Sequence, residues 1–426
     1  MITRIEARHY RSLRYVAQDV GRFQVLVGPN ASGKSTFLDV VGFVGDVLRG
    51  GLSAAVEGDA QLRIASRAPD SSHLVWMRGK GGFELAVELD IPAERCRQLP
   101  TGGHGVARYE IAIDTGAVLG LASETLWLKP AEGAPPARNR QQRFFPSPAH
   151  PPKNIVVAPC KRSPQGWKKV VSRGEDPANV QFHSETTGWN GPFRIGPSKS
   201  ALANLPEDEV RFPVATWVKD VLAEGVQRIV LASDAMRRPS PPGRTNTFLA
   251  DGSNLPWVAD HLHRSAPKRF QAWVEHVREA LPDLDVVTTR EREEDRRRYL
   301  VLRYRSGLEA PSWLVSDGTL RLLALTLLAY APDTRGTVLI EEPENGIHPR
   351  AIETVFQSLS SVYGAQVLCA THSPVAVAMA KAADVLCFAR DVEGATAIVR
   401  GDEHPQLREW KGEVDLGTLF ASGVLG

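Results

Sequence analysis

The stretch GPNASGKST, residues 28–36, decides the fold of this chain. It fits the pattern G-x-x-x-x-G-K-[ST], which here runs from Gly28 to Ser35. An apolar run, VLV at 25–27, comes directly before it, and apolar side chains with a helical period follow over 37–48. A strand, a tight turn and the start of a helix form the context in which this pattern binds phosphate. We therefore expect residues 28–36 to bind a nucleoside triphosphate.

Each part of this loop has a physical task. The glycines let the backbone curl so that successive N–H groups face phosphate oxygens, and the helix N-terminus adds its positive dipole. Lys34 is expected to contact the β- and γ-phosphates, and Ser35 is expected to hold Mg²⁺. ATP and Mg²⁺ are thus the expected cofactors. The expected ATP-binding residues of the loop are Gly28, Pro29, Asn30, Ala31, Ser32, Gly33, Lys34, Ser35 and Thr36.

The composition limits the class of protein. The chain has 426 residues, enough for two domains or one large domain with an insertion. Its 51 basic and 49 acidic residues leave a formal charge of +2, which neither requires nor excludes nucleic acid. The four cysteines show no metal-binding spacing. Because the first ten residues lack the apolar core of a signal peptide and the apolar run 320–331 is too short for a bilayer, we expect a cytoplasmic protein without a membrane partner.

Apolar patterning divides the chain into three expected parts. Residues 1–195 are expected to contain the phosphate loop and an antiparallel β subdomain. Residues 196–284 show helical periodicity in pieces and are expected to form a helical insertion or lid. Residues 285–426 return to an α/β pattern. The alternating segments that predict the β subdomain are HLVWMRG at 73–79, FELAVELDI at 83–91, YEIAIDT at 109–115 and ETLWL at 124–128.

A second set of candidate residues follows two apolar strands. Glu341 and Glu342 end the first strand, where parallel α/β sheets place their ligands. Glu341 is expected to organise Mg²⁺, and Glu342 to orient and deprotonate a water. His372 ends the second strand, at an interval that suits a helix returning to a parallel neighbour. We expect His372 to lie beside the two carboxylates.

A third element begins at Ser316. The sequence SDGT at 316–319, called the SDGT motif below, opens a helix that is apolar almost all round and is therefore expected to be buried. The Ser316 hydroxyl, the Gly318 amide and the helix dipole together form a candidate anion site. Because the chain already has one phosphate loop, this site is expected to serve the nucleotide of another copy. Simple helix capping is the alternative.

The order of these motifs resembles the ABC-type ATPase heads of the SMC, RecF and OLD group. The opening ITRIEARHYRSLRYV, the SDGT motif, EEPENGIHP at 341–349 and THSP at 371–374 resemble the stand-alone OLD-like ATP-binding proteins of the AAA family in bacterial anti-phage systems. The implied fold is an α/β P-loop NTPase of the ABC-ATPase head type. It has a mixed or parallel core sheet, an antiparallel β subdomain and a helical, loop-rich insertion. The resemblance covers residues 1–50 and 250–390.

The resemblance also implies roles for residues. Glu342 becomes the hydrolytic base, His372 the γ-phosphate sensor and Lys34 the third catalytic residue, while Ser35 and Glu341 hold the metal. Arg11 becomes a further nucleotide contact. Ser316 and Gly318 complete the site of a partner copy, because such heads close around two ATP molecules as head-to-tail homodimers. The motif departs from the usual Leu-Ser-Gly-Gly-Gln, and Glu341 replaces an aspartate; both variants occur in the OLD-like branch.

The implied function is an ATPase that works as a switch. It would convert ATP and water to ADP and phosphate, and would control a separately encoded effector protein in anti-phage defence. A nuclease domain of the TOPRIM type is not expected in residues 373–426, which lack the necessary acidic cluster. Two alternatives remain open: an ATP-bound scaffold with little turnover that holds an effector inactive, and a RecF-like DNA repair ATPase. DNA is a possible partner in each case.

Overall fold

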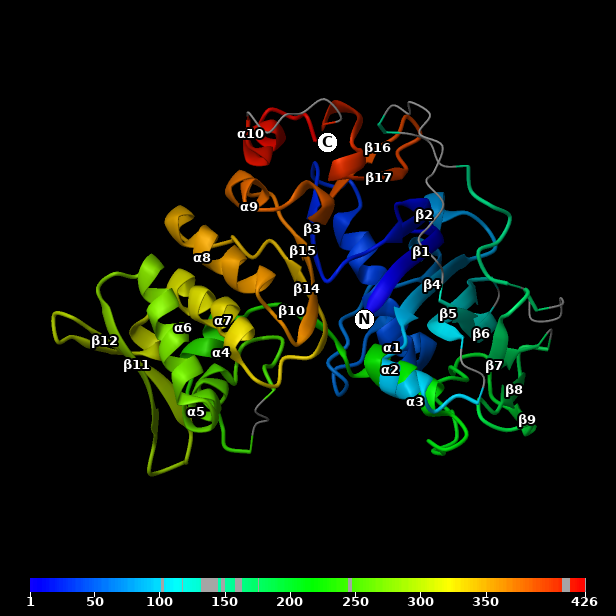
Figure 1. Ribbon diagram of the computed structural model, residues 1–426, viewed down its shortest axis with the longest axis horizontal. Helices are drawn as coiled ribbons and strands as arrows, with labels where there is room; N and C mark the ends of the chain where they lie inside the picture. The colour runs from blue at the N-terminus through cyan, green and yellow to red at the C-terminus, as the bar shows by residue number, and fades with distance from the viewer. Residues whose placement is uncertain are drawn as a thin grey trace.

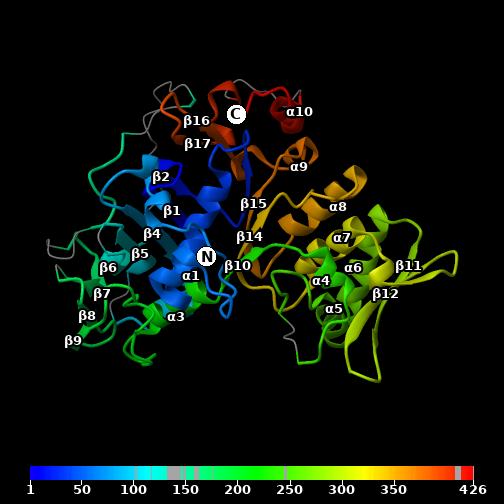
Figure 2. The ribbon, with the colours of Figure 1, turned by 180° about the vertical axis from the view of Figure 1, so that it is seen from behind.

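The computed structural model shows a central parallel sheet with a large antiparallel sheet on one side and a helical layer on the other (Figure 1). Figure 2 shows the same arrangement from behind. This is the expected α/β architecture with an antiparallel β subdomain. None of the described helices combines the length and the hydropathy that crossing a bilayer requires. The structure describes residues 1–100, 103–116, 118–131, 145–146, 150–157, 163–174, 176–243, 247–407 and 414–425.

The central sheet has six strands in the order β10-β14-β15-β3-β16-β17. All neighbours are parallel except the β16–β17 hairpin. The middle strands are buried along nearly their whole length, which explains their continuous apolar sequences. The strands are β3 (Phe23–Val27), β10 (Val226–Ile229), β14 (Gly336–Glu341), β15 (Ala365–Ala370), β16 (Val385–Arg390) and β17 (Thr396–Arg400).

The antiparallel sheet has eight strands in the order β2-β1-β4-β5-β6-β7-β8-β9. Three of the four predicted segments form strands in it. Residues 73–79 instead contain the end of one 3₁₀ helix, an isolated bridge from Val75 to Tyr10 and a second 3₁₀ helix, because the positive φ angles of Met77 and Arg78 break extended backbone. The strands are β1 (Ile2–Tyr10), β2 (Leu13–Asp19), β4 (Phe83–Asp90), β5 (His104–Asp114), β6 (Gly120–Pro130), β7 (Lys168–Arg173), β8 (Asn179–His183) and β9 (Asn190–Arg194).

Helix α1 (Lys34–Glu57) joins the two large sheets. Phe37 stacks edge-on against Phe388 of the central sheet, with ring centroids 5.7 Å apart. Phe43 contacts Phe83 of the antiparallel sheet at 5.5 Å. Both α1 side chains are fully buried, so the helix that follows the phosphate loop is anchored on both faces.

The helical layer packs on the other side of β14 and β10 (Figures 1 and 2). Its centre is α7, whose leucines are buried as expected, and Trp273 of α6 donates a hydrogen bond of 2.9 Å to Thr326 of α7. The layer contains α4 (Ser233–Arg237), α5 (Leu255–Ser265), α6 (Pro267–Ala280), α7 (Asp317–Tyr330), α8 (Pro349–Ser360) and a small sheet of β11 (Leu284–Glu291), β12 (Arg298–Tyr304) and β13 (Glu309–Pro311). The other helices are α2 (Ala93–Cys96), α3 (Pro213–Ala223), α9 (Pro374–Ala378) and α10 (Leu416–Ala421).

The structure distributes residues 196–284, expected as one helical insertion, among three places. Helix α3 packs against α1, where a Cβ on Gly45 would come within 2.6 Å of the Leu222 carbonyl oxygen. Strand β10 joins the central sheet beside β14, and α4 to α6 belong to the helical layer. The four residues of β10 are too few to show the alternation of apolar and polar residues that predicts a strand. Their partner strand also lies far away in the sequence, so the sequence did not indicate this strand.

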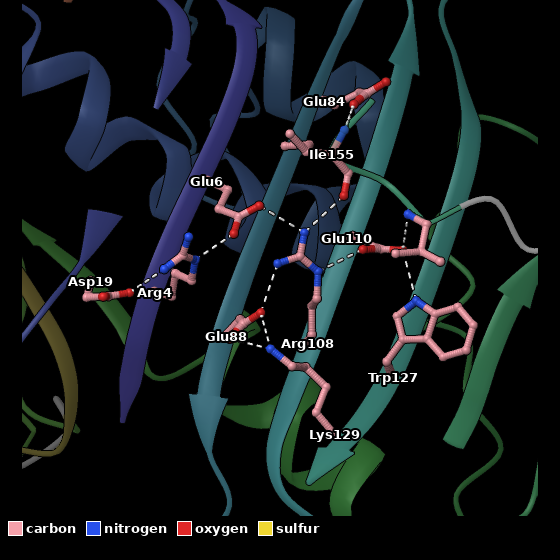
Figure 3. A network of polar contacts seen from close by, with 11 residues as sticks. Arg4, Glu6, Asp19, Glu84, Glu88, Arg108, Glu110, Trp127, Lys129 and Ile155 are labelled. Atoms are coloured by element: carbon pink, nitrogen blue, oxygen red, sulfur yellow. Dashed lines mark hydrogen bonds and ion pairs between the residues drawn. The ribbon is translucent and has the colours of Figure 1, made fainter. Parts of the chain in front are cut away.

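The outer face of the antiparallel sheet buries a network of charges (Figure 3). Arg108 donates hydrogen bonds to Glu110, Glu88 and Glu6 at 2.9, 2.9 and 3.0 Å. Lys129 donates two more to Glu88, at 2.9 and 3.0 Å. The Arg108 guanidinium thus connects β1, β4 and β5, and Lys129 adds β6 to the network through Glu88.

Residues 150–157 cover this network. The Arg108 guanidinium donates to the Ile155 carbonyl at 3.0 Å, while the Ile155 and Val157 amides donate to Glu84 and Glu110 at 2.6 and 2.8 Å. Burial raises the pKa of Glu110, and Arg108, Trp127 and the Val157 amide oppose that shift. The charged face is therefore an internal structural element of the sheet.

Candidate functional site

The ends of three neighbouring strands bring the predicted site residues together. Strands β14, β15 and β3 run parallel, with Ala370 level with both Glu341 and Leu26. The Glu342 amide donates to the Ala370 carbonyl at 2.8 Å, and the Thr371 amide donates to the Leu26 carbonyl at 3.1 Å. The phosphate loop, the two acids and His372 therefore meet at one edge of the sheet.

Two glycines of the loop are required by close packing. Gly28 and Gly33 have φ angles of 144° and 105°. A Cβ at Gly28 would overlap the Phe388 carbonyl oxygen, and one at Gly33 would overlap the Thr396 hydroxyl. The curl that the sequence predicts is thus fixed by the neighbouring hairpin as well as by glycine itself.

The β16–β17 hairpin holds the loop through two side chains that the sequence did not suggest. Arg390 donates to the Ala31 carbonyl at 2.6 Å, and Thr396 donates to the Ser32 carbonyl at 2.9 Å. Ala31 has a φ angle of 62°, so this alanine lies in the left-handed region. Pro29 and Asn30 are exposed at the tip of the loop.

Lys34 points back into the loop. The residue is only 6% exposed. Its Nζ donates hydrogen bonds to the carbonyls of Gly28 and Pro29 at 2.8 and 2.9 Å. Burial lowers the pKa of Lys34 to about 8, against the opposing effect of Glu342 and Glu341. The ammonium group has three donors, of which these carbonyls take two, so it can also bind a phosphate oxygen.

Ser35 and Glu341 are in direct contact. The Ser35 hydroxyl donates to one carboxylate oxygen of Glu341, and Arg228 of β10 donates to the other. Hydroxyl and carboxylate oxygens are the ligands that Mg²⁺ prefers, usually together with phosphate oxygens and water. In the described part of the chain no group of three or more His, Cys, Asp or Glu side chains could hold a metal alone, so a Mg²⁺ ion here would need the phosphates. Sequence reasoning missed Arg228, because only the β10–β14 pairing places it there.

Glu342 and His372 face each other across this edge. His372 Nε2 lies 4.0 Å from Glu342 Oε1, and Asn345 donates to the other carboxylate oxygen. Burial and then Lys34 lower the pKa of His372, so the imidazole is neutral at neutral pH. Glu342 has a φ angle of 48°, a conformation that non-glycine residues adopt rarely and that clusters at functional sites.

Glu344 positions the turn that carries His372. Its Oε1 accepts from the Thr371 hydroxyl at 2.8 Å and from the His372 amide at 2.7 Å. Its Oε2 is buried and has no hydrogen-bond partner among the described residues. The sequence contains a signal for this residue, a third acid in EEPEN at 341–345. Only the fold shows that its carboxylate faces Thr371 and His372.

The SDGT motif lies apart from the phosphate loop. The Ser316 hydroxyl caps α7, accepting from the Thr319 amide at 3.3 Å and sharing a hydrogen bond of 2.9 Å with the Thr319 hydroxyl. A Cβ at Gly318 would overlap the Gly346 carbonyl, so packing within the chain already requires this glycine. No hydrogen bond or ion pair joins Ser316 or Gly318 to residues 28–36 where the structure describes the chain. Ser316 is exposed.

Arg11 is engaged with α1. It has a φ angle of 51°, and its guanidinium donates to Asp39 at 2.9 Å and to the Arg67 carbonyl at 3.2 Å. The Tyr10 hydroxyl donates to the same carboxylate at 2.7 Å. Asp39 lies about one helical turn beyond Ser35, so Arg11 lies behind the loop, and its contact with nucleotide stays a prediction.

Comparison with solved structures bears on the fold. A structure of an SmcHead bound to the C-winged helix domain of ScpA matches 93% of this chain and 97% of that chain, with a TM-score of 0.52 and 13% sequence identity. The chain has the fold of an SMC-type ATPase head. A Pyrococcus furiosus Smc head domain with an extended coiled coil, bound to the C-terminal domain of ScpA, matches with a TM-score of 0.49, 13% identity, and coverage of 93% and 95%. The SMC head domain from Thermotoga maritima matches 94% of this chain and 98% of that chain, with a TM-score of 0.39 and 11% sequence identity.

The comparison with protein families covers part of the chain. Residues 172–378 match the family described as "AAA domain, putative AbiEii toxin, Type IV TA system". The matched range includes the SDGT motif, Glu341, Glu342 and His372 but not residues 28–36. No curated protein matches the chain. The predicted ABC-head fold is therefore confirmed, whereas the role of each site residue stays a prediction.

Proposed function

We propose that this SMC-type head binds ATP with Mg²⁺ and hydrolyses it to ADP and phosphate. The observation that carries the proposal is the contact of Ser35 with Glu341 at the edge where Lys34, Glu342 and His372 also meet. A hydroxyl and a carboxylate in contact beside a buried lysine fit a metal–triphosphate complex, and no simpler structural task explains all three groups.

Each residue has a separate task in this reaction. Lys34 and the loop amides bind the phosphates, and Ser35 with Glu341 would hold Mg²⁺, whose charge offsets that of the phosphates. Glu342 orients a water molecule and accepts its proton, with Asn345 fixing the carboxylate. Neutral His372 donates a hydrogen bond toward the terminal phosphate.

We further propose that two copies close head to tail around ATP. The support is that Ser316 is exposed and is not brought to the phosphate loop of its own chain. In the closed dimer, Ser316 and the amides of the SDGT motif contact the terminal phosphate bound by the partner. Hydrolysis removes these contacts, so the dimer reopens and the chain works as a switch.

The switch is proposed to control a separately encoded effector in anti-phage defence. The family description names an AbiEii toxin and a type IV TA system. The SmcHead structure shows that a head of this fold binds another protein in that case. A scaffold with little turnover and a DNA repair ATPase remain the competing proposals, and turnover separates them from the switch.

The experiment compares ATP turnover in the wild type, Glu342→Gln and Lys34→Ala. Wild type is expected to release phosphate, and Glu342→Gln is expected to bind ATP but lose turnover by at least about 10²-fold because the base is gone. Lys34→Ala is expected to lose ATP binding. Glu353→Gln, the same change on an exposed residue of α8, is the matched control. Absence of turnover in wild type, with and without DNA, would favour the scaffold; unaltered ATP affinity in Lys34→Ala would refute the site.

A further inference from the structure

A second candidate ligand site lies in the helical layer, away from residues 28–36. A cavity of about 670 Å³ opens between the end of α4, the turn of the β11–β12 hairpin and a 3₁₀ helix at Ser312–Leu314. This volume is in the range of small-molecule sites in proteins. The 3₁₀ helix leads directly into the SDGT motif.

One wall of the cavity is aromatic. Trp313 is 46% exposed, which is unusual for so large an apolar side chain. Tyr299 of β12 supports it, with ring centroids 4.9 Å apart and planes inclined by 46°. The pair provides a fixed aromatic surface on which a planar ring can stack.

Arginines also line the cavity. Arg238 is exposed, and the described residues provide no hydrogen bond or ion pair for its guanidinium. Among the described residues, the Arg292 guanidinium has one ion pair, a long contact of 3.6 Å between Nε and Asp295. Arg237 is the third, and it pairs with Asp317 of the SDGT motif. Guanidinium groups beside aromatic rings bind anions that carry a planar ring, because they pair with the charge and stack on the ring.

Hydrogen bonds join the segments that line the cavity. Ser240 and Arg298 exchange two backbone hydrogen bonds of 2.7 and 2.9 Å, which join the segment after α4 to β12. The Ser312 hydroxyl donates to the Arg237 carbonyl at 2.9 Å, which joins the 3₁₀ helix to α4. A site held in this way needs little ordering when a ligand binds.

The rim favours a small ligand over a polymer. Glu293 and Glu294 line the same cavity beside Arg292. Their negative charges repel the phosphate backbone of a nucleic acid that lies across the cavity. A compact ligand, by contrast, can place its anionic group against the arginines. The lining thus has three arginines and two glutamates, with one arginine shared with Asp317.

We propose that this cavity binds a small anionic ligand with a planar ring, of the nucleotide class, at a site separate from the phosphate loop. A ligand phosphate that engages Arg237 competes with Asp317, which directly follows Ser316. Occupancy of the cavity therefore changes the start of α7 and, with it, the rate of ATP hydrolysis. This regulatory part rests on the proposed function; the binding site itself does not.

The binding test uses Lys34→Ala protein, in which the phosphate loop is disabled, titrated calorimetrically with AMP, GMP, CMP and UMP. Saturable binding of at least one nucleotide is expected. Trp313→Ala and Arg238→Ala, each added to Lys34→Ala, are expected to weaken it about tenfold or more, since stacking on an aromatic side chain contributes about 1–3 kcal/mol. Arg194→Ala and Tyr363→Ala, which remove exposed side chains elsewhere, are the matched controls and are expected to leave Kd unchanged.

Three outcomes would overturn the site: no saturable binding, binding that Trp313→Ala and Arg238→Ala leave unchanged, or binding of single-stranded DNA or an acidic peptide without any mononucleotide. The regulatory part is tested by the ATP turnover of wild type and Trp313→Ala with and without the bound mononucleotide. A change of turnover in wild type that is absent in Trp313→Ala supports it. Unchanged turnover with proven binding refutes the regulation alone, and absent turnover with proven binding refutes the proposed function alone.

Discussion

Lys34 is the residue whose charge the site controls most directly. Its side chain is largely removed from water, and its two carbonyl partners replace only part of its hydration. Burial therefore lowers the pKa of Lys34 to about 8. A bound phosphate favours the charged form again, so nucleotide binding and protonation of this lysine are linked.

This linkage predicts proton uptake on ATP binding. Free Lys34 loses its proton as the pH rises through about 8, whereas bound Lys34 stays charged to higher pH. Above pH 8 the Kd for ATP is expected to rise, by up to about tenfold per pH unit. Calorimetry in buffers of different ionisation enthalpy measures the uptake. Lys34→Arg keeps its charge and should show none; equal uptake in both proteins would contradict the assignment.

Glu344 provides the second prediction at this scale. Because its carboxylate holds the Thr371 hydroxyl and the His372 amide, Glu344→Ala is expected to shift His372 and lower ATP turnover by about 10²-fold. The Kd for ATP is expected to change little, since among the described residues Glu344 has no hydrogen bond or ion pair with residues 28–36. Glu353→Ala is the control. A change in Kd as large as the change in turnover would show that Glu344 acts through folding instead.

Among the elements, the β16–β17 hairpin and α1 decide the shape of the site. The hairpin holds the phosphate loop by Arg390 and Thr396, and α1 is anchored by Phe37 and Phe43 to both large sheets. Movement of α1 relative to either sheet would therefore break buried aromatic contacts. The antiparallel sheet is stiffened in turn by the charges around Arg108.

Arg108→Met is expected to lower the free energy of unfolding by about 3–5 kcal/mol, because the buried carboxylates of Glu6, Glu88 and Glu110 lose a common partner. Denaturant unfolding followed by circular dichroism measures the loss. Arg194→Met, whose side chain is 80% exposed in the wild type, is expected to change stability by less than about 0.5 kcal/mol. Equal effects of the two substitutions would show that the network does not stabilise the sheet.

The sequence predicted those elements whose signal is local. The phosphate loop, the strand before Glu341 and the buried helix after Ser316 all follow from short runs of apolar residues and one turn or cap. Strand β10 could not be predicted, because its four residues form a strand through pairing with β14, which lies far away in the sequence. For the same reason Arg228 and Arg390 escaped notice: each reaches the site from a strand that only tertiary structure places beside it.

At the scale of the whole molecule, the two motifs proposed to contact ATP lie in different layers of the fold. The phosphate loop lies at the edge of the central sheet, and the SDGT motif opens a helix of the helical layer on the far side of β14 (Figure 1). No hydrogen bond or ion pair joins them within the described chain, which leads us to propose that a second copy completes each site.

Mixing two inactive variants tests this central claim most directly. Lys34→Ala and Ser316→Arg each damage both sites of a homodimer, but a mixed head-to-tail dimer keeps one intact site, built from the unaltered loop of one copy and the unaltered serine of the other. The account predicts that an equimolar mixture regains up to about a quarter of wild-type turnover, since half the dimers are mixed and each has one intact site. A mixture no more active than its separate components, with wild type remaining a single subunit in ATP, would contradict it.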